Sequence, residues 1–425
     1  MKKNTMIKIA ASAAALILMS TSASAGYTMK KKVGDVDTKL TFFGFAQLEM
    51  VGGDGMKIKE AGSVEKADSD VAFRAQRIRL GWKYVAGKVR GKVFLDFNQD
   101  ATGASDHTDG DSIPKLVKDA FIAYQADDAF TIKLGLIKMP HGMGFTMPGW
   151  NLDIAERGLD KSLVLERNTG LMFSGRDMFL GNNGKVDGFE MGHERPWKGF
   201  GYDVMIANQA SRSAALKRDT TVLPGGTSSG SIEFGGNSYA VRGMFDYTEA
   251  FHIEASYAIS QNAGGYNAVD GATTAADGFN EDYTSINVGI DSNLGALSLK
   301  AEYTTGNNIQ GVRDYNEKVA TATAAYFVTP TLELVAKHIQ ANAEGKYLNT
   351  HSTDLGNTYL GFNYFISSPY QDFSRKAKRG RNQHKVVFNY ILASGNGATE
   401  VAADKWTGLG GYRDDAFIVQ YQFKF

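Results

Sequence analysis

The sequence predicts an all-β protein, a transmembrane barrel of sixteen antiparallel strands. Apolar and polar residues alternate in segments of about ten residues, which is the pattern of strands that face lipid on one side and water on the other. The connections between these segments are alternately short and long, as in barrels of the bacterial outer membrane. The composition agrees, because 19 Tyr, 25 Phe and 48 Gly against only 7 Pro suit many paired strands and turns.

Two consecutive segments show the alternation most clearly. In the first, one face is apolar and carries Ile78, Leu80, Trp82 and Tyr84, and the other carries Arg77, Arg79, Gly81 and Lys83. The second repeats the pattern, with Val89, Val93, Leu95 and Phe97 against Arg90, Lys92, Asp96 and Asn98. A soluble β-sandwich also alternates, but it would interrupt such long apolar edges. We therefore expect the apolar face to contact lipid and the polar face to line a lumen.

The predicted strands lie near residues 39–51, 71–85, 88–99, 115–125, 130–138, 169–175 or 186–195, 200–209, 237–247, 251–261, 283–292, 296–306, 317–328, 331–340, 357–366, 382–392 and 414–425. The sixth strand has two candidates. Short connections such as 126–129 alternate with long ones such as 210–236. Because the short turns of such barrels are periplasmic, an even number of strands places both termini in the periplasm.

The N-terminus has the pattern of a cleaved export signal. Basic residues at the start precede an apolar run from Ile9 to Met19, and small residues end at Ala25. A short membrane anchor is the alternative, but the run is shorter than the roughly 20 residues that a bilayer requires. We expect residues 1–25 to be a signal peptide and residues 26–425 to be one outer-membrane barrel.

The charge balance and the residue types exclude several classes of protein. Removing the predicted signal takes three lysines from 46 basic residues and leaves all 46 acidic ones, so the net charge becomes −3, unlike a nucleic-acid-binding domain. There is no cysteine, and therefore no disulfide or thiol chemistry. His252, His338 and His384 lie on separate strands without metal-ligand spacing. We expect no catalytic residue, no metal and no cofactor.

The lumen-facing positions of the second to fifth strands form a predicted basic wall, whose members are Arg77, Arg79, Lys83, Arg90, Lys92 and Lys133. Two acids share this parity, Asp96 and Asp119, so the wall carries a net charge of +4. A tight turn at Ala86 and Gly87 would place Lys83 opposite Arg90, and Arg77 opposite Asp96. A basic wall in a narrow pore raises the local concentration of anions. Alternatively, these residues only solvate the lumen and pair with nearby acids.

Several motifs resemble one family. They are the run from 74 to 82 (RAQRIRLGW), 118 to 125 (KDAFIAYQ), 134 to 143 (LGLIKMPHGM), Glu156-Arg157, 165 to 175 (LERNTGLMFSG) and the end of the chain, 414 to 425 (DDAFIVQYQFKF). Together they resemble the phosphate-selective porin O and P family. The resemblance implies a sixteen-stranded outer-membrane porin that is usually a trimer, with phosphate selectivity in only some members. Phe425 resembles the C-terminal signature that outer-membrane insertion machinery recognises.

The connection after the fifth strand, residues 139–168, is unusually long, and long connections usually serve a function. It is the third outer connection, which in sixteen-stranded porins folds into the lumen and narrows it. We expect this position here, with a helix-like piece from Leu152 to Glu166. The candidate residues of this constriction loop are Lys138, His141, Asp153, Glu156, Arg157, Asp160, Lys161 and Arg167. Its acids could neutralise the basic wall, so the selectivity stays open.

These observations predict an open channel for small hydrophilic solutes with a preference for anions. A weakly selective or substrate-specific channel without phosphate selectivity is the alternative. An outer-membrane lipase would need a serine, histidine and acid on the lipid-facing surface, and no such set is present. A plugged adhesin would not need so polar a lumen. The expected partners are outer-membrane lipid, lipopolysaccharide, small anions and two further copies of the chain.

Overall fold

The computed structural model describes residues 27–53, 57–60, 63–66, 71–98, 115–178, 198–209, 213–216, 236–247, 250–261, 281–345, 353–366, 372–373, 381–398 and 408–425. The predicted signal peptide and the alternative sixth strand at 186–195 lie outside these residues.

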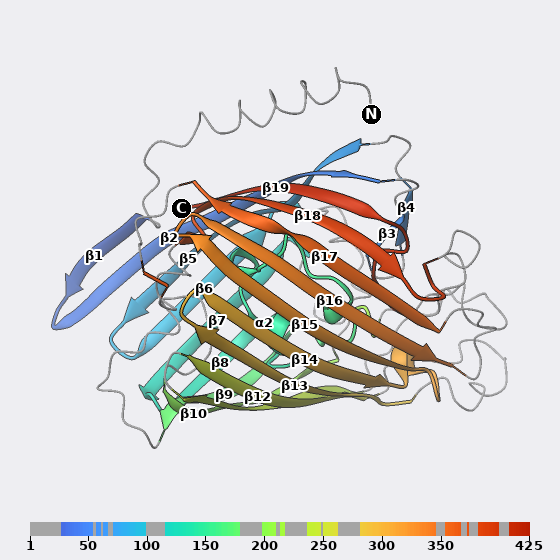
Figure 1. Cartoon of the computed structure of the whole chain (residues 1–425). Helices are drawn as coiled ribbons and strands as arrows, with labels where there is room; N and C mark the ends of the chain where they lie inside the picture. The colour runs from blue at the N-terminus through green and yellow to red at the C-terminus, as the bar shows by residue number, and fades with distance from the viewer. Residues whose placement is uncertain are drawn as a thin grey trace.

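Sixteen strands close into a barrel (Figure 1), and the predicted fold class is confirmed. Each strand pairs antiparallel with the next along the chain, and the last pairs with the first. The strands are β2 (Val36–Gly52), β5 (Val71–Ala86), β6 (Val89–Asp96), β7 (Val117–Asp127), β8 (Phe130–Lys138), β9 (Arg167–Met178), β10 (Gly199–Asn208), β11 (Asn237–Tyr247), β12 (Phe251–Ser260), β13 (Tyr283–Leu294), β14 (Leu297–Asn307), β15 (Asn316–Thr329), β16 (Leu332–Glu344), β17 (Asp354–Phe365), β18 (His384–Ser394) and β19 (Ala416–Lys424). The sixth barrel strand, β9, contains the candidate segment 169–175.

Three further strands were not expected from the sequence. β1 (Tyr27–Val33) forms a hairpin with the start of β2, along the same edge of β2 that pairs with β19 further on. β3 (Lys57–Glu60) and β4 (Ser63–Lys66) pair with each other in the first outer connection. None of the three belongs to the closed ring.

The turn between β5 and β6 differs from the predicted one by one residue. Ala86 pairs with Val89, so the turn consists of Gly87 and Lys88. Gly87 has a φ of 56°, and a glycine at the first central position is typical of a type II′ hairpin turn. The register therefore shifts by two: Lys83 lies opposite Lys92, not Arg90, and Asp96 lies opposite Arg79, not Arg77.

The two faces of the barrel have opposite chemistry. The large apolar side chains that remain exposed include the predicted lipid-facing stripe of β5, namely Ile78, Leu80, Trp82 and Tyr84. The intervening residues point inward, and many of them are polar and buried. Among the residues that the structure describes, no helix combines the length and the apolar composition needed to cross a bilayer.

The third outer connection contains α2 (Met143–Thr146) and two short 3-10 turns, η3 (Gly149–Asn151) and η4 (Leu159–Lys161), so the expected helix from Leu152 to Glu166 is wrong. The reason lies in its backbone, which bonds to strand side chains instead of forming helical turns. Lys385 on β18 donates to Leu152 O at 2.7 Å, and Asn389 accepts from Ala155 N at 2.9 Å. Figure 1 shows α2 within the ring of strands.

Parts of three other outer connections pack against this segment. Ser213 accepts a hydrogen bond from Glu166 N at 2.7 Å, and Ala215 O accepts one from Gln310 N at 2.7 Å. An apolar core joins all four connections and includes Leu159, Leu163, Leu216, Ile309, Val312 and Leu409. The outer connections therefore fill much of the space beside β13 to β18.

Candidate functional site

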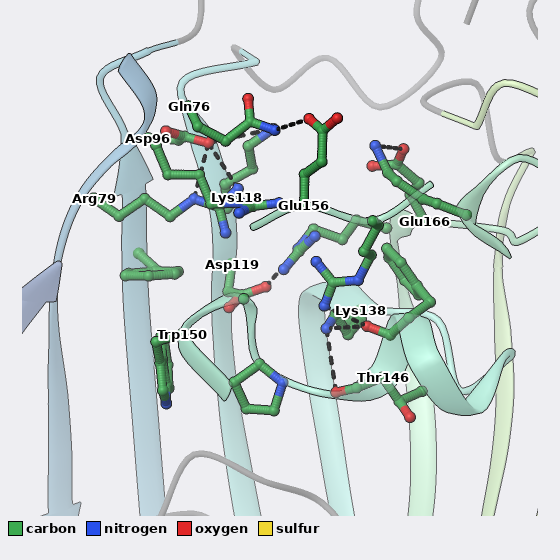
Figure 2. Close-up of a pocket in the computed structure, with 18 of the residues that line it drawn as sticks. Gln76, Arg79, Asp96, Lys118, Asp119, Lys138, Thr146, Trp150, Glu156 and Glu166 are labelled. Carbon is green, nitrogen blue, oxygen red and sulfur yellow. Dashed lines mark hydrogen bonds and ion pairs between the residues drawn. The ribbon is translucent and has the colours of Figure 1, made fainter. Parts of the chain in front are cut away.

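A cavity of about 270 Å³ lies between the inner faces of β5 to β9 and the segment 139–166 (Figure 2). The strands contribute most of the charged side chains of the lining, and the segment contributes the aromatic side chains of Phe145 and Trp150. Gly410, Gly411 and Tyr412 of the last outer connection also line the cavity.

Basic side chains outnumber acidic ones around this cavity. Nine are basic, namely Arg77, Arg79, Lys92, Lys115, Lys118, Lys138, Arg157, Lys161 and Arg167. Four are acidic, namely Asp96, Asp119, Glu156 and Glu166. The lining therefore has five more basic than acidic residues. In a narrow space with low-dielectric walls, such an excess of basic residues favours a positive potential.

Two aspartates on the strands each contact two cations. Asp96 lies 2.9 Å from Arg79 and 3.9 Å from Lys118, and Figure 2 shows both basic side chains beside it. Asp119 lies 2.6 Å from Lys92 and 2.9 Å from Arg167. One carboxylate shared by two cations holds both in position and neutralises only one of them.

Two basic residues of the lining are held by backbone carbonyls of the segment. Lys138 donates to Phe145 O at 2.7 Å, and Arg157 donates to Gly144 O at 3.2 Å. The Phe145 ring lies 4.7 Å from Lys138 Nζ. Burial, and then repulsion by Arg77, lowers the pKa of Arg157 to about 9, so it stays charged at neutral pH.

Glu166 is also charged. Its carboxylate lies 2.8 Å from Lys161. Burial opposes the charge on Glu166, but the attraction of Lys161 and Lys118 lowers its pKa to about 2. Glu166 therefore remains ionised, and the basic residues of the lining still outnumber its acids.

The remaining acids of the segment face other strands. Asp153 pairs with Lys300 on β14, and Asp160 pairs with Lys337 on β16, both at 2.6 Å. Glu156 alone among the three reaches β5, where Arg74 and Gln76 donate to it at 3.1 and 2.9 Å. Two of the three acids that could neutralise the basic wall thus bind lysines of other strands.

The family model described as phosphate-selective porin O and P matches residues 60–425. The chain belongs to this family. The resemblance inferred from the motifs is confirmed, and the protein is a porin, a diffusion channel of the Gram-negative outer membrane. No curated protein sequence matches this chain.

Solved structures support the same fold. OmpF of Salmonella typhi, in complex with daunomycin, is 14% identical with a TM-score of 0.56, over 93% of this chain and 100% of that chain. An anion-selective porin from Comamonas acidovorans is 12% identical with a TM-score of 0.53, over 91% and 100%. OmpT of Vibrio cholerae in a trimer form is 11% identical with a TM-score of 0.50, over 91% and 99%. At these identities the likeness establishes the barrel fold of this porin.

The predicted site residues of the porin separate into two groups. Those that line the cavity are Arg77, Arg79, Lys92, Lys138, Glu156, Arg157, Lys161 and Arg167. The other three residues of the basic wall lie elsewhere: Lys83 contacts the Phe43 ring, Arg90 donates to the Gly87 carbonyl, and Lys133 contacts the Phe121 ring. Asp153 and Asp160 bind the lysines of β14 and β16. His141 is buried in the interior. Burial lowers the pKa of His141 to about 4, so its ring is neutral at physiological pH.

Sequence reasoning missed Gln76 and Lys118 because each lies in a β-bulge. The pairing of β2 with β5 skips Gln76, and the pairing of β6 with β7 skips Lys118. An extra residue in one strand breaks the alternation of faces, so Lys118 and its neighbour Asp119 both reach the cavity. Beyond the first bulge, Arg74 also turns inward and contacts Glu49 at 2.8 Å. Strict alternation assigns Arg74 to the outer face.

Among the described residues, no cluster of histidine, aspartate and glutamate has the arrangement of a metal site.

Proposed function

We propose that this porin preferentially passes small anions through the cavity beside β5 to β9. The observation that carries the proposal is the excess of five basic residues in the lining. A positive potential concentrates anions at a constriction and repels cations. Several cations along the wall provide successive weak sites, so an anion can enter and also leave.

The selectivity of the unmodified porin tests this proposal. In a planar bilayer with a KCl gradient, we expect a zero-current potential of the sign that indicates chloride preference. The preference should be greatest in dilute salt, because the Debye length falls from about 10 Å at 0.1 M to about 3 Å at 1 M. A potential of the opposite sign would overturn the proposed anion preference.

Phosphate is one candidate solute within the anion class, and the family description is the reason to test it. Adding phosphate at constant chloride activity should reduce the chloride current if phosphate binds in the cavity. An anion-selective pore in which phosphate leaves the chloride current unchanged supports the alternative, a weakly selective diffusion channel. The pairing of Asp96 and Asp119 with wall cations is the observation that favours this alternative, because it reduces the free positive charge.

We further propose that the porin is a homotrimer embedded in outer-membrane lipid and lipopolysaccharide. The support is the trimer form of the similar OmpT of Vibrio cholerae, together with the continuous apolar outer face. Sedimentation in mild detergent should give three times the mass of one chain. A single monomeric species across a range of protein concentrations and detergents would contradict the proposed assembly.

A further inference from the structure

The last outer connection lies between β18 and β19, and the part of it described at residues 408–415 reaches the cavity through Tyr412. The hydroxyl of Tyr412 donates a hydrogen bond to Oε1 of Glu156. The other oxygen of Glu156 accepts from Arg74 at 3.1 Å and from Gln76 at 2.9 Å, the contact drawn in Figure 2. The carboxylate of Glu156, in the third outer connection, is thus held between β5 and the last outer connection.

The position of Tyr412 is well determined by its surroundings. Its N–H donates to Asn357 Oδ1 at 2.8 Å, and its carbonyl accepts from Asn357 Nδ2 at 2.7 Å. Its ring meets that of Tyr359 edge to face, with centroids 6.2 Å apart. Gly410 and Gly411 have φ values of 72° and 87°, so the chain can turn inward just before Tyr412.

The hydroxyl of Tyr412 acts as a donor at any physiological pH. Burial, and then the negative charge of Glu156, raises the pKa of Tyr412 well above its usual value. A protonated hydroxyl next to an ionised carboxylate forms a charge-assisted hydrogen bond, which is stronger than a neutral one.

We propose that Tyr412 is a positioning residue for ion selectivity, because it holds the carboxylate of Glu156 against β5 and limits the negative charge that passing anions meet. The inference rests on the proposed anion preference. Without the hydroxyl, Oε1 of Glu156 loses this donor. The carboxylate then gains freedom to turn into the cavity, where it opposes anion entry and attracts cations.

The central test compares Tyr412→Phe with Tyr359→Phe. We expect Y412F to lower the chloride-to-potassium permeability ratio about twofold, since one charge of the lining changes its exposure to the ion path. Y359F is the matched control: the Tyr359 hydroxyl is buried and has no hydrogen-bond partner among the described residues, and the ring contact is kept. Y359F should leave the ratio unchanged.

A double-mutant cycle identifies the route of the effect. Glu156→Gln should raise the permeability ratio, because it removes an acid from the lining. In the E156Q background, Y412F should have no further effect on the ratio. Equal effects of Y412F in both backgrounds, or an effect of Y359F as large as that of Y412F, would overturn the role of Tyr412.

Two further outcomes are covered: a Y412F variant that does not insert into membranes, and an unmodified porin that does not prefer anions. If Y412F does not insert into membranes, Asn357→Leu loosens the same residue through its backbone and should shift the ratio in the same direction; an unchanged ratio with N357L would then count against the proposal. If the unmodified porin prefers cations, the proposed function fails. Opposite shifts by Y412F and E156Q would still demonstrate that Tyr412 positions Glu156.

Discussion

Replacing Arg77, Arg79 and Lys118 together by glutamine is expected to move the zero-current potential in a KCl gradient toward cation preference. All three line the cavity, and their removal leaves six basic against four acidic residues there. Asp96 would also lose both of its cations and face the ion path with its charge exposed. We expect the chloride-to-potassium permeability ratio to fall ~10-fold, which corresponds to about 1.4 kcal/mol.

A second triple variant controls for the number of charges. Lys83, Arg90 and Lys133 belong to the same predicted wall but do not line the cavity. Their replacement by glutamine removes the same total charge, yet it should change the ratio less, because mobile salt screens charges over about 10 Å at 0.1 M. Equal shifts from the two triples would mean that the whole wall, and not the cavity, determines selectivity.

Replacing Lys337 by methionine is expected to destabilise the third outer connection and widen the pore. Lys337 pairs with Asp160 at 2.6 Å, and both side chains are buried. Removing one partner of a buried pair leaves an unpaired charge and costs about 3–5 kcal/mol. Because Asp160 anchors the segment to β16, we expect a higher single-channel conductance with frequent fluctuations, together with a lower thermal unfolding temperature in detergent.

Two further variants test whether the unpaired charge of Asp160 causes the effect of Lys337→Met on stability and conductance. Asp160→Asn combined with Lys337→Met removes both charges and should recover most of the stability and the lower conductance. Arg313→Met breaks a more exposed pair with Glu281 at the outer rim and should change stability by at most about 1 kcal/mol. If Lys337→Met alters neither conductance nor stability, the contacts of Lys300 and Lys385 suffice to hold the segment.

The strands and their two faces could be predicted from the sequence, because alternation is a local property. Whether Ile78 or Arg79 faces lipid depends only on the period of two and on the chemistry of the two solvents. The family was recognisable for a related reason, since its motifs are short, continuous runs such as 74–82. The basic character of the inner wall could be predicted from the same alternation, because its basic residues occupy the inward-facing positions of the strands.

Only the tertiary structure decided which charges meet. The bulges at Gln76 and Lys118 depend on how two strands pair, and a single unpaired residue reverses the faces beyond it. The partners of Asp153 and Asp160 are lysines more than a hundred residues away. The contact of Tyr412 with Glu156 joins two outer connections that are distant in the chain. The sequence by itself determined a barrel with a basic inner wall, whereas long-range packing decided where the acids lie and hence where positive charge remains.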